Sequence, residues 1–274
     1  MFIEVNGDSL TVSGKYQEKS GTIFQQGSDS VEINSSQNIY SNGHGEKVAL
    51  TEKANKINKR NAHVFFIGGA GDKRPYLGQG PNNNILYAKQ FFDKEITSTS
   101  IGNKVKSDYL GFYEVYPKSN IDKNIISSIP NKTDVIYIIG HSLGGWNAVY
   151  TASYISESGY NVRILMTLDP VGTKNGVHWI SELYDPVEDG LYKGKKYRWY
   201  NVRNSAKNKN FSDLVAAAGG QATVISGQFG KADTTIDVDI NHSYANKMFT
   251  IKLYDNKSKS MLDVLKNDII SQLK

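Results

Sequence analysis

One serine in this chain has the neighbours expected of a catalytic nucleophile. Ser142 is the third residue of the sequence GHSLGG at residues 140–145. The five residues before this sequence are apolar, as in a strand buried on both faces, and Trp146 and Val149 after it recur at helical spacing. The sequence therefore predicts a tight strand-to-helix turn that holds the serine hydroxyl clear of a sheet, free to attack a carbonyl carbon.

The glycines on either side of Ser142 fit such a turn. A Cβ at Gly140 or Gly144 would clash with the neighbouring strand or helix, because the turn is sharp. The backbone N–H of Leu143 would then point toward an oxyanion at the helix N-terminus. The pattern Gly-x-Ser-x-Gly alone occurs by chance in many chains, so the apolar run before it and the helical spacing after it carry more weight.

A nucleophilic serine needs a general base, and neutral imidazole suits this role at pH 7. Of the five histidines, His44 lies in a polar N-terminal region and His63 begins a predicted strand. His141 adjoins the serine on the turn, and we expect it to face elsewhere. His178 is better interpreted as a surface or lid residue. His242 is late in the chain, where a loop can fold over the carboxyl ends of the strands, and we expect it to be the base.

An aspartate that follows a predicted strand is the candidate to orient this base. Residues 161–168 form a β-rich apolar run that ends at Asp169, so the carboxylate should lie at the carboxyl edge of the sheet. Asp213, at the start of a predicted helix, is the alternative acid.

A second oxyanion donor is expected from the loop after an early strand. The sequence FIGGAG at residues 66–71 supplies such a loop, and its small residues let the backbone approach an oxyanion. Ala70 or Gly69 is the candidate donor. A phosphate-binding P-loop is excluded because Asp72 follows the last glycine, and a dinucleotide fingerprint is excluded because Arg74 stands where glycine is required.

Residues 237–241, DVDIN, are similar to the start of a calcium-binding loop. His242 stands where that loop requires glycine, and Met248 stands where it requires glutamate. No Cys/His cluster suggests zinc, since the chain has no cysteine. We therefore expect neither a metal nor a cofactor.

The elements that must position these groups alternate between strand and helix. Strands are predicted at 63–68, 110–116, 135–139, 161–168, 199–202 and 250–254, and helices at 82–92, 121–129, 213–218 and directly after the serine turn. A C-terminal amphipathic helix shares one apolar face among Met261, Leu262, Leu265, Ile269, Ile270 and Leu273. This alternation predicts an α/β fold, with a mostly parallel sheet covered by helices on both faces.

The 274 residues, 39% of them hydrophobic, can form one large α/β domain with an extension. Residues 1–60 are rich in Ser, Gly, Asn and Gln and are predicted to be a small β-rich extension, for docking or delivery. Residues 61–274 are the predicted catalytic domain. The N-terminus lacks the pattern of a Sec signal, so we expect synthesis in the cytoplasm. The net charge of +5 permits attraction to anionic surfaces, but no motif predicts specific nucleic-acid binding.

Four features together resemble the lipase-like branch of the α/β-hydrolase superfamily. They are GHSLGG at 140–145, LDPVG at 168–172, FIGGAG at 66–71 and the late His242. The resemblance covers about residues 60–274 and implies an α/β-hydrolase fold.

The same resemblance implies Ser142 as nucleophile, Asp169 as acid and His242 as base, in the chain order of α/β hydrolases. Asp169 departs from many members, because it follows the strand next after the serine strand and many members place the acid one strand later. The implied reaction is hydrolysis of lipid esters, as by a lipase or phospholipase.

The N-terminal region loosely resembles the front ends of bacterial toxin effectors that ride a type VI secretion spike. This resemblance implies export into target cells by a route without a signal peptide. The implied partners are a spike protein and a neutralising immunity protein.

Two inserts, 173–198 and 204–234, are candidate lids over an acyl pocket, with Trp179 and Ile180 as candidate substrate-binding residues. Residues 191–209 hold seven cations and no acid, which would attract an anionic phospholipid surface or form a solvated basic face. Two alternatives stay open. One is an esterase, thioesterase or peptidase for a small soluble substrate, and the other is an inactive hydrolase fold used for binding.

Overall fold

Six parallel strands form the centre of the fold. The computed structural model describes residues 60–76, 78, 80–173, 181–184, 197–221, 232–253 and 258–274. The strands are β1 (Ala62–Gly68), β2 (Val105–Gly111), β3 (Val135–His141), β4 (Asn161–Leu168), β5 (Arg198–Asn204) and β6 (Thr234–Val238). Their order in the sheet is β2-β1-β3-β4-β5-β6, and every neighbouring pair is parallel.

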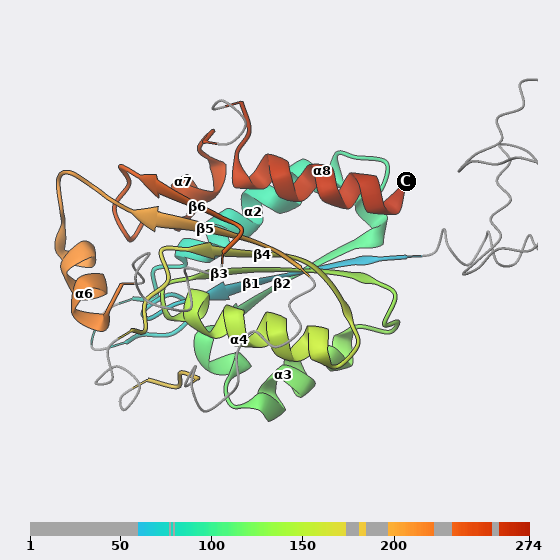
Figure 1. The fold of residues 1–274 in the computed structure, drawn as a ribbon, viewed down its shortest axis with the longest axis horizontal. Helices are drawn as coiled ribbons and strands as arrows, with labels where there is room; N and C mark the ends of the chain where they lie inside the picture. Colours follow the sequence, from blue (N-terminus) through green and yellow to red (C-terminus); the bar gives the residue numbers. More distant parts are fainter. Residues whose placement is uncertain are drawn as a thin grey trace, which may run out of the picture. The chain divides into compact units, whose positions relative to one another are not determined.

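Helices cover both faces of this sheet. They are α2 (Asn84–Thr97), α3 (Lys118–Asn124), α4 (Leu143–Glu157), α6 (Phe211–Gly219), α7 (Ala245–Thr250) and α8 (Met261–Leu273). Three short 3-10 helices cover Gly102–Lys104, Phe112–Val115 and Ile126–Ser128. Figure 1 shows α3 and α4 on one face and α2, α7 and α8 on the other, while α6 lies beyond the arrowheads of the strands. The α/β architecture predicted from the sequence is thus confirmed.

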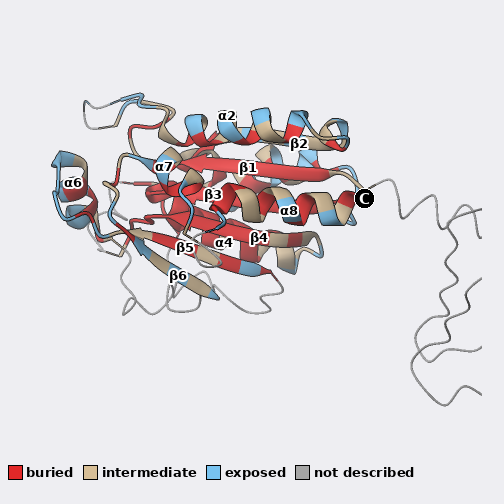
Figure 2. Cartoon of the chain, turned by 90° about the horizontal axis from the view of Figure 1, so that it is seen from above, coloured by how far each residue is buried: buried red, intermediate tan, exposed pale blue. Residues whose placement is uncertain are grey.

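The alternation of side chains along β3 explains its uninterrupted apolar sequence. Ile136 and Ile138 enter the core beneath α3 and α4, whereas Val135, Tyr137 and Ile139 enter the core beneath α2, α7 and α8. A central strand covered on both faces has no polar side, so an apolar run of this length is what the architecture requires. All seven residues of β3 are accordingly buried (Figure 2).

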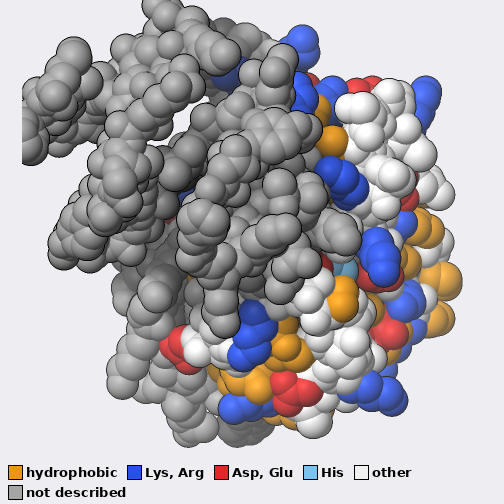
Figure 3. All heavy atoms as spheres, turned by 90° about the vertical axis from the view of Figure 1, so that its right-hand side faces the viewer, with side chains coloured by type: hydrophobic (Ala, Val, Ile, Leu, Met, Phe, Trp, Pro, Cys, Tyr) orange, Lys and Arg blue, Asp and Glu red, His pale blue; other side chains and the backbone are white. Residues whose placement is uncertain are grey.

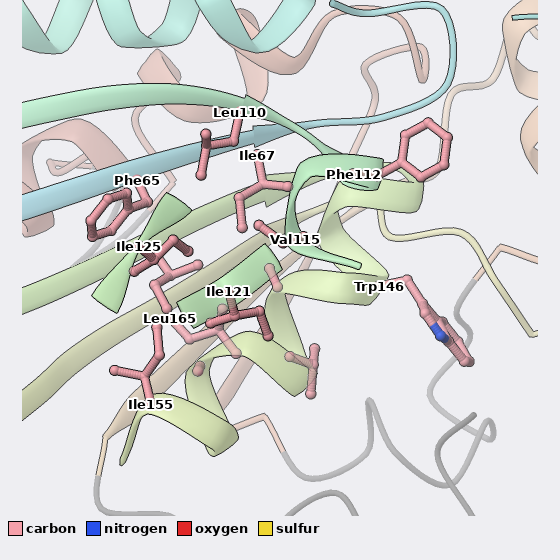
Figure 4. Close-up of a cluster of buried hydrophobic side chains, with 14 of the residues drawn as sticks. Phe65, Ile67, Leu110, Phe112, Val115, Ile121, Ile125, Trp146, Ile155 and Leu165 are labelled. Carbon is pink, nitrogen blue, oxygen red and sulfur yellow. The ribbon is translucent and has the colours of Figure 1, made fainter. Parts of the chain in front are cut away.

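The core beneath α3 and α4 is closed by large aliphatic and aromatic side chains. Figure 4 shows Phe65 and Ile67 of β1 gathered with Ile121 and Ile125 from the region of α3. A fully buried side chain of this size contributes about 1.5–3 kcal/mol relative to an exposed one. This packing fixes α4, which carries the serine turn at its N-terminus, against the sheet.

Two predicted strands are wrong. The strand predicted at 110–116 lies earlier, at Val105–Gly111, and Phe112–Val115 is a 3-10 helix. That helix forms because the Glu114 carboxylate accepts a hydrogen bond from the Gly111 N–H at 2.7 Å. No strand is present at residues 250–253, the described part of the strand predicted at 250–254, and Thr250 is the last residue of α7.

The other predicted elements lie close to their expected positions. The helix predicted at 121–129 is split into α3 and a 3-10 turn at Ile126–Ser128. The C-terminal amphipathic helix is α8, with most of its predicted face buried and Ile270 partly buried. No helix in the described ranges is long and apolar enough to span a membrane.

Several predictions fall outside the described residues and stay predictions. They concern nearly all of the extension at 1–60, the histidines at 44 and 178, and the substrate-binding candidates Trp179 and Ile180. Most of the insert at 173–198 and residues 222–231 of the second insert belong to the same group.

Candidate active site

Ser142 lies on the turn between β3 and α4, at the carboxyl edge of the sheet. Its backbone has φ 56° and ψ −128°, a left-handed conformation that a non-glycine residue rarely adopts. Strain of this kind costs about 1–3 kcal/mol and persists only where the surroundings enforce it. Here the Ser142 N–H donates to the Leu168 carbonyl at 3.2 Å, and the Ser142 carbonyl accepts from Trp146 and Val171.

Close backbone contacts around the turn require the glycines of the sequence. A Cβ on Gly140 would lie 2.5 Å from the Gly144 carbonyl oxygen, and one on Gly144 would lie 2.4 Å from the Ile67 carbonyl oxygen. A Cβ on Gly69 would lie 2.4 Å from the Ser142 Cβ. The expected reason for the flanking glycines is confirmed, and the loop after β1 passes directly beside the serine.

The structure brings together three residues that are far apart in the sequence. The Nε2 atom of His242, in the loop after β6, lies 3.0 Å from the Ser142 Oγ. Its Nδ1 atom lies 2.5 Å from Oδ2 of Asp169, the residue that follows β4. If Nδ1 carries the proton and donates to Asp169, the Nε2 lone pair is free to accept from the serine hydroxyl.

Asp169 is fully buried and held by four hydrogen bonds. Besides His242, the Asn204 N–H donates to Oδ1 at 3.0 Å, and the Gln221 Nε2 donates to both oxygens at 2.6 and 2.8 Å. Burial raises the pKa of Asp169, but the hydrogen bond and charge of His242, with the Asn204 and Gln221 donors, outweigh burial and hold the pKa below its ordinary value. The carboxylate is thus kept ionised beside the imidazole.

Asp213, the alternative acid, has a different place in the site. Its Oδ1 accepts from the backbone N–H of His242 at 2.7 Å, and its Oδ2 accepts from the Asn241 side chain at 2.6 Å. Burial raises the pKa of Asp213, and its hydrogen bonds to Asn210, His242 and Asn241 together bring it below the ordinary value. Asp213 therefore fixes the backbone of the His242 loop, while Asp169 contacts the ring.

His141 does not face away from the site, which corrects the sequence expectation. Its Nε2 donates to the carbonyl oxygen of His242 at 2.8 Å, and the two rings lie 4.8 Å apart, tilted by 34°. Burial, with the nearby His242, lowers the pKa of His141 to about 3, so this ring is neutral at pH 7. His141 contacts the His242 ring and supports its loop.

The loop after β1 is held beside Ser142 by a buried carboxylate. Asp72 accepts from the Tyr109 hydroxyl at 2.8 Å and from the Ile85 N–H at 3.1 Å. Burial raises the pKa of Asp72 despite these donors. A Cβ on Gly69 would lie 3.0 Å from the Ser142 Oγ, so this loop lies directly beside the serine, and Gly69 and Ala70 are both candidates for the second oxyanion donor.

Leu143 is the other candidate oxyanion donor. It is the first residue of α4, so its N–H has no acceptor within the helix. The helix N-terminus adds a partial positive charge at this position. The Leu143 N–H is therefore suited to donate to an oxyanion beside Ser142.

A described piece of the first insert is anchored next to the site. The Ser181 and Tyr76 hydroxyls lie 2.6 Å apart, and the Tyr184 carbonyl accepts from the Trp146 Nε1 at 2.9 Å. Asn147 of α4 donates to the Glu182 carbonyl at 2.7 Å. Residues 181–184 thus connect the loop after β1 to the helix that carries the nucleophile.

Sequence reasoning missed several residues that position the triad. Asn204 ends β5 at the carboxyl edge of the sheet, a location that could have indicated a site residue. Asp72 directly follows a glycine-rich loop, a position from which a carboxylate can anchor that loop. Nothing in the sequence around Gln221 indicates that its side chain reaches Asp169.

The geometry of the turn and the order of the three residues define the fold class. A parallel sheet, a serine on a strained strand-to-helix turn, and the chain order serine, aspartate, histidine are the features of an α/β-hydrolase fold. The predicted fold class is confirmed for the described residues.

The chain matches no protein-family model and no curated protein. Its structure is similar to the esterase domain of a Rhodothermus marinus protein, with 12% identity, a TM-score of 0.41, and coverage of 74% of this chain and 84% of that chain. A fungal esterase from Rhizomucor miehei is similar with 11% identity and a TM-score of 0.45, over 80% of this chain and 77% of that chain. The Pyrobaculum calidifontis esterase is similar with 13% identity and a TM-score of 0.40, over 77% of this chain and 76% of that chain. Identities and TM-scores this low do not show that these proteins and this chain share a reaction.

Proposed function

We propose that this chain is a serine hydrolase that cleaves carboxylic esters, with lipid esters as its substrate class. The observation that supports the proposal best is the unbroken series of contacts from Ser142 through His242 to Asp169. A hydroxyl, an imidazole and an ionised carboxylate in this series are the parts that acyl transfer to serine requires.

In the first half of the reaction, the Ser142 Oγ attacks the ester carbonyl carbon and its proton passes to the His242 Nε2. Asp169 accepts the hydrogen bond from Nδ1 and stabilises the imidazolium that forms. The N–H groups of Leu143 and of Gly69 or Ala70 donate to the oxyanion. The carbon–oxygen bond to the alcohol then breaks, and the alcohol leaves with the proton from His242.

In the second half, water takes the place of the alcohol. His242 removes a proton from the water as its oxygen attacks the acyl carbon. The intermediate collapses, the bond to the Ser142 Oγ breaks, and the serine recovers its proton from His242. The carboxylic acid is released and the enzyme returns to its starting state.

A lipid substrate is supported by the resemblance of the GHSLGG turn to those of lipases and by the positive net charge. The rival is a soluble ester or thioester of similar chemistry. Delivery as a type VI effector, with its spike and immunity partners, stays a separate prediction, because the segment on which it depends lies outside the described residues.

The test is ester turnover by the purified full chain and by Ser142→Ala. p-Nitrophenyl esters from acetate to palmitate, and fatty-acid release from phospholipid vesicles, give the chain-length and lipid preference. We expect wild type alone to hydrolyse long-chain esters and release fatty acid. Turnover restricted to short soluble esters would favour the rival substrate. Absence of any turnover by folded wild type would favour the binding protein.

A further inference from the structure

Helix α6 turns an apolar face outward. Phe211, Leu214, Val215 and Ala218 recur at the i, i+3, i+4, i+7 spacing of one helix face, and all four are exposed. The exposed fractions of Phe211, Leu214 and Val215 are 69%, 60% and 48%. Because the apolar face of a helix normally packs into a core, its exposure here indicates a surface that binds an apolar partner.

The opposite face of α6 holds the catalytic loop. Asp213 and Ala216 are buried there, and Asp213 accepts the hydrogen bond from the His242 N–H. The Ser212 Oγ also accepts from the Ser243 N–H at 3.3 Å. The outward apolar face is therefore on an element that directly contacts the proposed site, at the carboxyl end of the strands (Figures 1 and 2).

Two lysines lie directly before the helix. Lys207 and Lys209 are exposed, and within the described ranges neither ammonium has an ion-pair partner. Arg203, in contrast, is paired with Asp237 at 2.7 Å. Of the nearby carboxylates, Asp213 is buried, and Asp239 is exposed but accepts from the Lys207 backbone N–H.

The residues Lys207, Lys209, Phe211, Leu214 and Val215, called the α6 patch below, combine an apolar face with free positive charge. The neighbouring Tyr244 is 41% exposed, and the Lys247 Nζ lies 4.1 Å from its ring centroid, which adds an aromatic–cation pair. Figure 3 views the described domain from the side opposite to α6, and the coloured part of that view shows Lys and Arg interspersed with Asp and Glu.

We infer that the α6 patch docks the protein on an anionic lipid surface, with the apolar face in the acyl region and the lysines at the headgroups. This inference rests on the proposed ester hydrolase function, for which it would place the active site beside its substrate. Charge complementarity favours lipid as the occupant. A second copy docked through the same patch would bring like charges together, whereas anionic headgroups neutralise them.

The test measures sedimentation of the full chain with sucrose-loaded vesicles. Vesicles contain phosphatidylcholine and phosphatidylglycerol at about 70:30, and the Ser142→Ala background removes any dependence on turnover. We expect Phe211→Ser/Leu214→Ser to lower the partition coefficient about tenfold or more. The matched control is Tyr87→Ser/Phe91→Ser, which removes an exposed apolar pair, each 48% exposed, from α2. We expect this control to bind as the parent does.

A second pair of variants separates position from total charge. Lys207→Gln/Lys209→Gln should lower partition about tenfold, and Lys106→Gln/Lys123→Gln, which removes the same charge from exposed residues elsewhere, should have little effect. Vesicles of phosphatidylcholine alone should bind the parent weakly.

Equal loss of binding in the apolar variants of α6 and α2, or no loss in either, would overturn the docking role of the α6 patch. Self-association of the parent without vesicles, abolished by Phe211→Ser/Leu214→Ser, would identify a second copy as the occupant instead. Turnover of p-nitrophenyl butyrate by the α6 variants with intact Ser142 tests the hydrolase separately. We expect it to match wild type, and its absence in all proteins would refute the proposed function whatever the vesicles show.

Discussion

His141 donates a hydrogen bond from its Nε2 to the backbone carbonyl oxygen of His242 at 2.8 Å, and the centroids of the two imidazole rings lie 4.8 Å apart, with the rings tilted by 34°. His141, the residue before Ser142, thus supports the loop that carries His242, 101 positions later. The His141 Nδ1 is buried without a hydrogen-bond partner. Protonation at this nitrogen would bury an unpaired charge next to His242.

This buried ring should make stability depend on pH. The pKa of His141 is about 3 in the folded chain and 6.5 in a model peptide, so below about pH 6.5 the unfolded state binds more protons. The free energy of unfolding should therefore decrease as the pH is lowered below about 6.5. We expect wild type to lose about 2 kcal/mol more than His141→Gln between pH 6.5 and 4.5, measured by urea denaturation.

Comparing the two proteins isolates His141 from the other titrating groups. The raised pKa of Asp72 acts in the opposite direction, but it is present in both. The lowered pKa of Asp169 makes its contribution to stability disappear only below its ordinary pKa of 3.8, outside this range. Parallel pH profiles for the two proteins would mean that His141 is protonated in the fold.

The choice of acid gives a second prediction. Asp169→Asn should lower kcat about 10³–10⁴-fold, because an amide in this position favours the wrong imidazole tautomer. Asp213→Asn should lower kcat much less, since Asp213 holds only the backbone of the His242 loop. Ester hydrolysis at pH 8 by variants with wild-type circular dichroism measures both. The reverse ranking would assign the acid role to Asp213.

The close approach of the loop after β1 gives a third prediction. Gly69→Ala should lower kcat at least about a hundredfold, because its Cβ would lie 2.4 Å from the Ser142 Cβ and displace the nucleophile. Gly78→Ala is the control, since nothing lies within 4 Å of its added Cβ. Because Gly78 has a φ of 76°, Gly78→Ala should lower the free energy of unfolding by about 1–2 kcal/mol, but its kcat should equal that of wild type. An active Gly69→Ala enzyme would show that the loop can move away.

How well the sequence predicted each element depends on its burial. Residues 161–168 were assigned correctly because β4 is central and mostly apolar. The edge strand β2 was placed too late, since its exposed positions Lys106 and Asp108 interrupt the apolar pattern, and the apolar residues after Gly111 form a 3-10 helix instead.

The three proposed triad residues were found because each carries a chemically distinctive side chain next to a strand end. The contacts that position them could not be read in the same way. His141 meets His242, and Gln221 meets Asp169, only through loops whose paths depend on tertiary packing. Contacts between residues so far apart in the sequence cannot be predicted from the local sequence.

In the proposed mechanism, His242 and Asp169 activate Ser142 as a nucleophile. An alkyl fluorophosphonate reacts with an activated serine, so intact-mass and peptide spectrometry of the labelled full chain tests this mechanism directly. We expect one adduct, on the peptide that contains Ser142, with no adduct in Ser142→Ala and labelling at least about a hundredfold slower in His242→Ala. An adduct on another residue, or equally fast labelling of His242→Ala, would contradict the mechanism.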